Sequence, residues 1–440
     1  MIALIWILVW LAALATGAFF LPMAKGREKR WAGVASLMLA LVGIIGLGVT
    51  LNGGAPTIVG PFVMGAAPIT IAPAMMLGAI ALVLLAGRAE ASSNETSWLL
   101  GMLCFESVAL LAGDTVLLIV AEGLATAVLA AHARRRGQRA HFAYLGFATL
   151  ALALSLAVLA VSPIPAGAEL PPVVAGLFAL VAFVRLGIFP FSTGMLSSLD
   201  RGPTTATLMA ALPYGGVLLL IRANPSLQAL GISEFVVDWL LVVAPLAAAL
   251  AITQNQLGRS LGYTLASTHA LIALGALDPT PAGQLGGELL WAGALLTSTG
   301  FGAAANLVTL RIGSPDLARH HGLHASAPFL SLAFLVLGVG LAGAPGTVQF
   351  VAEDILLNTA STEGTLGMAL VVGTIALIGF NVLRMQFRIF FGSSPIARSY
   401  LQTKSRERLG LIMVGGAVVL GGMAPSLLPL VSAAAQASGH

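Results

Sequence analysis

Charge and cysteine are both scarce in this sequence. Only 9% of its 440 residues are Asp, Glu, Lys or Arg, whereas soluble domains carry about 25%. Hydrophobic residues make up 58%, and the mean hydropathy is +0.97. Because Cys104 is the single cysteine, a disulfide framework and a CxxC metal site are both excluded. The composition is that of a polytopic membrane protein.

Further absences narrow the function. The chain has no nucleotide-binding loop, no cysteines for an iron–sulfur cluster and no nucleophile triad. Its net charge of +4 comes from short loops, so no basic face is available for nucleic acid. His320, His321 and His324 cluster in one loop, but no carboxylate or cysteine completes a metal site there. We expect no nucleic-acid partner, no metal and no cofactor, and we expect any redox or hydration chemistry to belong to partner proteins.

Long apolar runs occupy almost the whole chain, so we expect an all-α protein that crosses the lipid bilayer about fourteen times. A cleavable signal peptide over residues 1–24 is an alternative for the first run, but the basic loop that follows favours a retained helix. The runs lie at about 2–22, 31–51, 68–87, 97–112, 115–132, 142–162, 171–195, 203–221, 234–253, 260–277, 286–310, 327–357, 365–391 and 409–432.

Basic residues lie on one side of this predicted topology. Of the 21 Lys and Arg residues, 17 fall in loops after odd-numbered runs, and only Arg222 falls in a loop after an even-numbered run. The positive-inside rule then places the odd loops in the cytoplasm and both termini on the other side. The 17 residues are Lys25, Arg27, Lys29, Arg30, Arg88, Arg134, Arg135, Arg136, Arg139, Arg201, Arg259, Arg311, Arg319, Arg398, Lys404, Arg406 and Arg408.

Arg185 lies inside an apolar run, five residues before Pro190. A charge at that depth costs between roughly 2.5 and 17 kcal/mol, depending on the reference system, and typically marks an ion pathway. A proline removes one backbone hydrogen bond, which membrane helices tolerate only where neighbouring groups or water replace it. We therefore predict a helix broken at Pro190 in an ion-translocating protein.

The twelfth run is too long for one span and contains Gly343-Ala344-Pro345-Gly346, so we predict a second broken helix at Pro345.

Glu122 lies in the middle of its run with no opposite charge nearby in the sequence. One interpretation is a neutral carboxyl group that bonds to a backbone carbonyl. The functional interpretation pairs Glu122 with Arg185, whose charge would favour the ionised carboxylate while burial opposes it. We expect the two groups to approach within a salt bridge or one bridging water.

The second break is followed directly by Glu353 and Asp354. A helix interruption in a membrane exposes backbone dipoles and admits water, so Glu353 is expected to exchange protons there. Asp354 is expected to cap the restarted helix.

His269, in a polar patch of its run, suits either a proton relay or a bridge between helices. Four intramembrane groups are secondary candidates for the pathway: Glu106, Glu288, Asp354 and Arg384.

Several of these segments together resemble one known superfamily, the antiporter-like subunits of respiratory complex I, membrane-bound hydrogenases and Mrp antiporters. Residues 185–193 with 203–205 are similar to its Lys-x-Pro-x-x-Pro-Phe-His-x-Trp … Ala-Pro-Thr signature, and residues 343–353 to its second broken helix. Glu122 matches its Trp-Glu pair, residues 260–264 its Leu-Ala-Tyr-Ser motif, and residues 388–392 its Arg-x-Phe-Phe-Gly segment. The resemblance covers most of the chain from about residue 97 onward.

The resemblance implies a fourteen-helix core with two inverted five-helix repeats, each containing a broken helix. The implied divisions are three N-terminal helices (1–96), a first repeat (97–222), a second repeat (223–392), and a cytoplasmic loop with a last helix (393–440). It also implies a subunit of a complex-I-like assembly in a bacterial inner membrane, which moves protons or sodium as partner subunits do chemistry. The pathway residues would be Glu122, Arg185, Ser192, His269 and Glu353.

The sequence departs from the superfamily at several relay positions. Arg185 replaces the signature lysine, Ser192 its histidine and Gly194 its tryptophan. The lysine of the next helix falls among Ala210, Ala211 and Leu212, and the lysine near Trp291 is Ala292. Arginine does not release its proton in a protein, so Arg185 can bias a neighbouring carboxylate but cannot itself carry protons.

Two alternatives remain open at this point. One is a transporter subunit of a two-component inorganic-carbon accumulation system with a zinc-bearing soluble partner. The other is a structural scaffold whose channel has decayed, which the missing lysines favour. The retained buried charges argue against decay, because a lost channel should also lose groups that are costly to bury.

Overall fold

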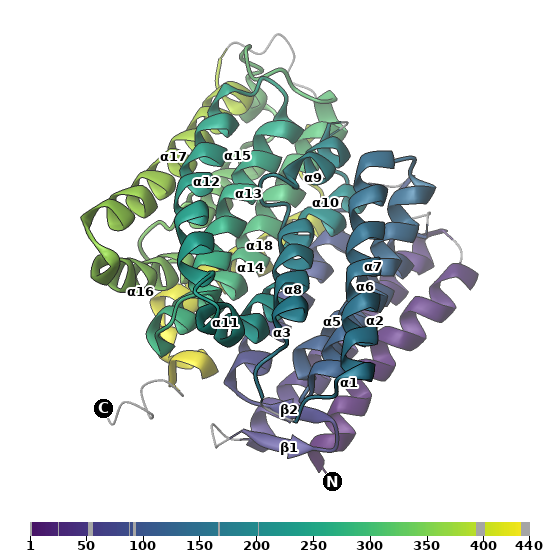
Figure 1. Cartoon of the computed structure of the whole chain (residues 1–440). Helices are drawn as coiled ribbons and strands as arrows, with labels where there is room; N and C mark the ends of the chain where they lie inside the picture. Colours follow the sequence, from purple (N-terminus) through teal and green to yellow (C-terminus); the bar gives the residue numbers. More distant parts are fainter. Residues whose placement is uncertain are drawn as a thin grey trace.

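The computed structural model describes residues 2–432 except 25, 52–55, 88, 91–93, 166–167, 201 and 393–400. It is a bundle of helices, most of which run along one common direction (Figure 1). Four of the basic residues used to predict the topology lie outside the described residues: Lys25, Arg88, Arg201 and Arg398.

Helices account for about four fifths of the chain, and the described residues also contain one short hairpin. The hairpin pairs β1 (Thr57–Val59) with β2 (Phe62–Met64) in antiparallel fashion. The α-helices are α1 (Ile2–Phe20), α2 (Gly26–Leu51), α3 (Ala66–Leu85), α5 (Glu95–Leu111), α6 (Thr115–Arg135), α7 (Arg139–Val161), α8 (Pro172–Leu186), α9 (Ser192–Leu199), α10 (Thr205–Ala211), α11 (Val217–Ala229), α12 (Ser233–Thr253), α13 (Leu257–Ala276), α14 (Pro281–Ile312), α15 (Pro328–Leu341), α16 (Val348–Glu363), α17 (Thr365–Phe390) and α18 (Ser405–Met423). Short 3₁₀ turns include η1 (Leu21–Met23), η2 (Leu323–Ala325) and η4 (Pro425–Leu427).

Eight of the described helices are long and apolar enough to cross a bilayer, and α8 and α15 are shorter apolar helices. Within a bilayer a backbone must satisfy its own hydrogen bonds, which a helix does. The prediction of a mostly helical, multi-pass membrane protein is therefore confirmed.

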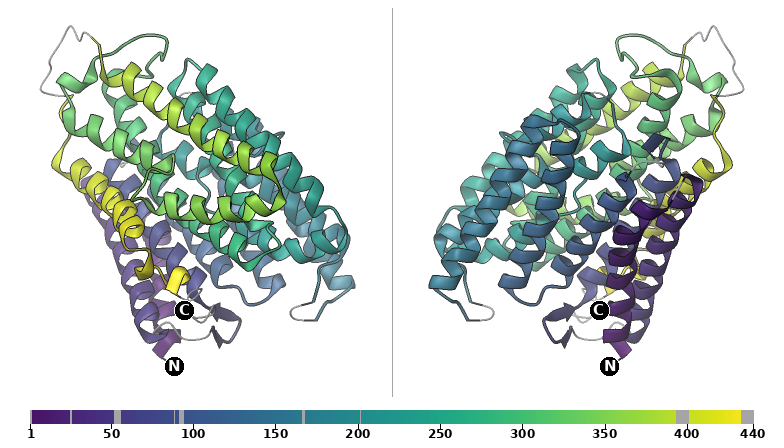
Figure 2. Two further views of the ribbon diagram at one scale, coloured as in Figure 1. Left: turned by 90° about the vertical axis from the view of Figure 1, so that its left-hand side faces the viewer. Right: turned by 90° about the vertical axis from the view of Figure 1, so that its right-hand side faces the viewer.

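Both predicted helix breaks are present. Helix α8 ends at Leu186, where Gly187 has a left-handed conformation (φ +61°), and α9 begins after Pro190. Helix α15 ends at Leu341, and α16 begins after Pro345. In the two views of Figure 2 and in Figure 1, α16 lies crosswise to the long helices.

The N-terminal cap of α16 differs from the prediction. The hydroxyl of Thr347 accepts a hydrogen bond from the N–H of Phe350 at 3.4 Å. Asp354 lies in the second turn of the helix and is exposed. The prediction that Asp354 caps this helix was wrong, because free N–H groups occur only in the first turn.

A third break divides the predicted run 203–221 into α10 and α11. The intervening segment is Leu212-Pro213-Tyr214-Gly215-Gly216, and Gly216 has φ +93°. A proline lacks an N–H, and a glycine readily takes a positive φ, so this sequence ends one helix and redirects the chain into the next. We had predicted one uninterrupted helix here.

Helix α14 lies at the centre of the bundle, since every residue from Leu289 to Val308 is buried. Glycine allows its close approach to α13: a Cβ atom on Gly275 would lie 2.5 Å from the Cα of Gly287. Small residues at such crossings let helix backbones pack tightly in a membrane.

The two ends of the bundle have different composition. The start of α1, the hairpin and η4 lie together at the lower end in Figure 1. The loop between α5 and α6 is at that end too, because Ala112 forms a β-bridge with Phe62. The opposite end holds the last turn of α6 and the first turn of α18, with Arg134, Arg135, Arg136, Arg311 and Arg406. We call it the arginine-rich end.

Candidate functional site

Arg185 occupies the last turn of α8, at the first break, and its side chain is buried. Its Nη2 forms an ion pair with Oε1 of Glu106 on α5. Its Nη1 donates a hydrogen bond to the hydroxyl of Thr126 on α6 at 3.2 Å. The direct ion-pair partner of Arg185 is thus Glu106, which sequence reasoning ranked as secondary. In the sequence, the only argument for Glu106 was its depth inside an apolar run, and Glu122 shares that property.

Glu122 lies in the same group but has a different partner. It is fully buried, and its Oε1 accepts a hydrogen bond from the N–H of Gly216 at 3.2 Å. The Thr126 hydroxyl, which Arg185 contacts, donates to the carbonyl of Glu122 at 2.7 Å. Among the described residues no ion pair joins Glu122 directly to Arg185, and the expected approach through one bridging water stays a prediction. Glu106, Glu122, Thr126 and Arg185 form what we call the first-break cluster.

The third break completes this cluster. A methyl group at Gly215 would collide with the guanidinium of Arg185 and the carboxylate of Glu106, so only glycine fits there. Trp291 on α14 holds the break in place, since its indole Nε1 donates to the carbonyl of Pro213 at 2.5 Å. Sequence reasoning missed these positions. The Pro-Tyr-Gly-Gly string within an apolar run was the signal that could have identified them.

His269 lies against the same break from the other half of the chain. Its ring is fully buried on α13, and Nδ1 lies 2.7 Å from the carbonyl of Leu186, the residue after Arg185. Because a carbonyl only accepts, Nδ1 carries the proton in this contact. Nε2 has no partner among the described residues. His269 therefore joins the two halves at the first break, with one ring nitrogen available.

Glu353 lies at the second break. It is 3% exposed, and its carboxylate fills the space beside Gly343, where a methyl group would collide with it. Gln349, one turn earlier, is fully buried. No ion pair among the described residues includes Glu353. This carboxylate is thus buried without a fixed cation beside it.

Of the remaining candidates, Arg384 has a structural role, whereas the contacts of Ser192 and Glu288 assign no role to either. Arg384 donates to the carbonyl of Gln254 at 2.5 Å and to Asn381 Oδ1 at 3.1 Å, so it caps the C-terminal end of α12. Ser192 is buried in the first turn of α9, beside the break. Glu288, on α14, is half-buried and forms no ion pair within the described part of the chain.

The loop histidines have local contacts. His320 Nε2 lies 3.0 Å from Arg388 Nη1, and His321 Nε2 lies 3.0 Å from the carbonyl of Asp316. The ring of His324 stacks on Phe391. No group of three or more His, Cys, Asp or Glu side chains within the described ranges is placed to hold a metal.

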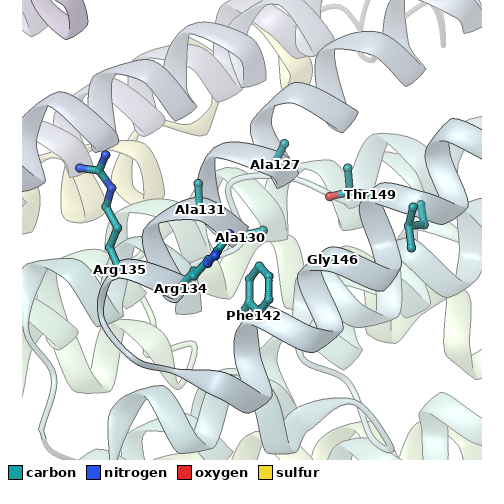
Figure 3. A pocket seen from close by; sticks show the side chains of 9 residues that line it. Ala127, Ala130, Ala131, Arg134, Arg135, Phe142, Gly146 and Thr149 are labelled. Atoms are coloured by element: carbon teal, nitrogen blue, oxygen red, sulfur yellow. The ribbon is translucent and has the colours of Figure 1, made fainter.

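A groove of about 750 Å³ between α6 and α7 contains none of the candidates. Ala127, Ala131 and Gly146 are among the residues that line it, and Arg134 lies beside the ring of Phe142 (Figure 3). Its lining is mostly apolar, and no carboxylate or histidine is among the residues that form it. The site therefore lies inside the bundle, at the breaks.

Comparison with known proteins agrees with this geometry. The family described as NADH:quinone oxidoreductase/Mrp antiporter, transmembrane, matches residues 166–379. The match covers just under half of the chain. The resemblance drawn from the sequence motifs is therefore confirmed.

Curated relatives are similar to this chain over part of their length. NADH-quinone oxidoreductase subunit N of Alkalilimnicola ehrlichii is 30% identical over 272 residues, which cover 59% of this chain and 54% of that protein. The chain thus spans about half the length of the curated relatives it matches.

Solved structures share the fold. A chain of respiratory complex I from Thermus thermophilus with bound NADH superposes with a TM-score of 0.83 at 21% identity, covering 98% of both chains. A chain of the Mrp complex from Dietzia sp. gives a TM-score of 0.82 at 16% identity, covering 98% of this chain and 96% of that one.

Proposed function

We propose that this chain is a membrane subunit of a larger complex and that it moves protons, or another small cation, across the bilayer while partner subunits supply the driving chemistry. One observation carries the proposal: buried ionisable groups gather at the helix breaks. Glu106, Glu122 and Arg185 meet at the first break, His269 contacts it, and Glu353 lies at the second. Buried charges are costly in a membrane and mark ion pathways.

The charge balance of the first-break cluster suits proton transfer. One guanidinium cannot neutralise two carboxylates, and Arg185 does not lose its own proton. The three groups together carry one negative charge when both carboxylates are ionised, and none when one proton is bound. The cluster can therefore hold one exchangeable proton without leaving a net buried charge. Glu106, paired with Arg185, supplies the fixed part, and Glu122 supplies the exchangeable part.

We also propose how the chain crosses the membrane. It would cross fourteen times, with a first five-helix repeat at 97–222 and a second at 223–392. Residues 1–96 would precede these repeats, and residues 393–440 would follow them. The start of α1 and η4 lie at one end of the bundle, which supports an even number of crossings (Figure 1). The breaks at Pro190 and Pro345 occupy comparable places in the two repeats. The arginine-rich end would face the cytoplasm of a bacterium, with both termini on the other side of the inner membrane.

The alternatives have less support. The similar proteins are complex I and Mrp antiporter subunits, and they do not favour an inorganic-carbon system with a zinc-bearing partner. The scaffold hypothesis leaves the buried Glu106, Glu122 and Glu353 unexplained, since a scaffold has no use for groups this costly to bury.

The test replaces Glu353 with Gln in the native complex and measures proton uptake by reconstituted vesicles in sodium-free and sodium-containing buffers. Glutamine keeps the shape and hydrogen bonding of glutamate but cannot exchange a proton. We expect uptake to be lost and assembly to be retained. Asp354→Asn, at the exposed neighbouring residue, is the matched control and should leave uptake unchanged. Normal uptake by Glu353→Gln in both buffers would favour the scaffold hypothesis, and uptake by the unmodified complex only in the sodium-containing buffer would identify sodium as an exchanged ion.

A further inference from the structure

A second set of buried titratable side chains lies toward the arginine-rich end of the first repeat, outside the first-break cluster. His132, near the end of α6, is 2% exposed, and its Nε2 lies 2.5 Å from Oε2 of Glu95 on α5. The other oxygen of Glu95 forms an ion pair with Arg136. His141, in the first turn of α7, is 4% exposed. Neither histidine is explained by the proposed site.

These side chains lie beside a polar cavity at the arginine-rich end. The cavity has a volume of about 330 Å³ and lies between the α6–α7 turn and the segment from α9 to α10. Arg136, which binds Glu95, is part of its wall, and so is Ala140, the neighbour of His141 in the chain. Its polar wall residues include Arg136, Gln138, Arg139, Ser197, Asp200 and Thr204. Water in this cavity would therefore lie close to both histidines.

His141 also reaches the first break. Its ring lies against Gly194, in the first turn of α9. A Cβ atom at Gly194 would lie 3.3 Å from His141 Nδ1 and 2.6 Å from the ring of Tyr144, so the absence of a side chain there makes room for both rings. Tyr144 in turn contacts the hydroxyl of Thr193 at 2.9 Å. His141 lies within electrostatic range of both Arg185 and His132.

We propose that His141, together with the Glu95–His132 pair, carries protons between the polar cavity at the arginine-rich end and the first-break cluster. Each histidine keeps one ring nitrogen that has no partner among the described residues: Nδ1 of His132 and Nε2 of His141. A proton binds to the free nitrogen from water, and the proton on the opposite nitrogen leaves, so the ring ends with the charge it began with. His132 is six residues from Thr126 on α6, which is about 9 Å along the helix. His132 and the first-break cluster therefore lie less than two helical turns apart along α6.

A purely structural role predicts something different. If the histidines only join α5, α6, α7 and α9, then a residue that keeps the packing should preserve transport. If they carry protons, transport should fail with intact assembly, and an added proton carrier of the same chemistry should restore it. The inference rests on the proposed function, because it supplies an entrance to that site.

The experiment measures proton uptake by vesicles containing the native complex with His141→Ala, in the absence and presence of free imidazole. We expect uptake to fall at least tenfold and to recover several-fold with imidazole. His324→Ala, which removes a loop histidine stacked on Phe391, is the control and should behave as the unmodified complex does with or without imidazole. Unchanged uptake by His141→Ala, or loss that imidazole does not restore, would overturn the inference.

Two further variants keep the result interpretable. His141→Gln preserves polarity and much of the volume, so it tests the same role if the alanine variant fails to assemble; normal uptake by it would overturn the inference. Glu122→Gln is measured in parallel. Lost uptake in Glu122→Gln with normal uptake in both His141 variants would leave the proposed function standing and remove this entrance. Normal uptake in Glu122→Gln as well would contradict both.

Discussion

The first and second helix breaks hold buried carboxylates in two different ways. At the first break, Arg185 is paired with Glu106 and hydrogen-bonded to Thr126, and Glu122 bonds to the backbone at Gly216. At the second break, Glu353 is buried beside Gly343, and no ion pair in the described part of the chain includes it. One break therefore carries a permanent charge with a counter-charge, and the other carries a single titratable group.

This difference suggests a division of roles. A fixed guanidinium sets a constant electric field, which acts on any proton that reaches Glu122. A carboxyl without a fixed partner changes its charge only by binding or releasing a proton. His269 contacts the first break from the second half of the chain, so it lies where the two breaks can influence one another. The following predictions test whether the two breaks differ as described.

The largest effect on stability is expected for Glu106→Gln. This change leaves Arg185 buried without its counter-ion, and breaking a buried ion pair typically costs about 3 to 5 kcal/mol. We expect the complex to dissociate at a clearly lower temperature or to fail to assemble. Glu288→Gln is the matched control, since it removes a carboxylate that is in no described ion pair, and it should change the dissociation temperature little. Equal behaviour of the two variants would show that the first break does not depend on its ion pair.

A smaller effect is expected for Gly343→Ala at the second break. Gly343 has φ +66°, a conformation that costs other residues roughly 1 to 2 kcal/mol, and the new methyl group would collide with the Glu353 carboxylate. We expect modest destabilisation and a larger loss of proton uptake, because Glu353 must move. Gly373→Ala on α17, where nothing lies within 4 Å, should leave uptake unchanged. Normal uptake by Gly343→Ala would mean that the position of Glu353 is unimportant.

The smallest effect is expected for Thr126→Val. Valine keeps the shape but loses the hydrogen bond to Arg185, and single hydrogen bonds in membrane proteins contribute roughly 1 kcal/mol or less. The ion pair with Glu106 remains, so assembly and uptake should be nearly normal. Thr374→Val is the control, because within the described part of the chain that hydroxyl bonds only to the carbonyl of Leu370 on its own helix. A loss as large as that of Glu106→Gln would show that Thr126, rather than the ion pair, fixes Arg185.

Local signals in the sequence predicted much of the fold. Apolar runs of membrane length located the long helices, and proline with glycine located the breaks after Leu186 and Leu341. These features depend on neighbouring residues only. The break at Pro213 has the same kind of signal, but the apolar residues around it suggested one continuous helix.

Partners across the bundle could not be predicted in the same way. Glu106 and Glu122 are both buried carboxylates in adjacent runs, and only the packing of α5, α6 and α8 decides which one meets Arg185. His132 and His141 lie at the ends of their helices beside arginines, where the sequence alone indicates an ordinary cytoplasmic loop. Their burial depends on α5 and α9, which are distant in the chain.

The most direct test of the account compares proton uptake by Arg185→Lys and Arg185→Ala in the native complex at matched amounts. If Arg185 acts through its charge, lysine keeps the positive charge beside Glu106 and should preserve assembly and much of the uptake. Alanine leaves Glu106 and Glu122 buried without a cation and should abolish uptake. Lysine as damaging as alanine would contradict the account and make the two-armed guanidinium a structural clamp on the broken helix. Normal uptake with alanine would remove the first break from the pathway altogether.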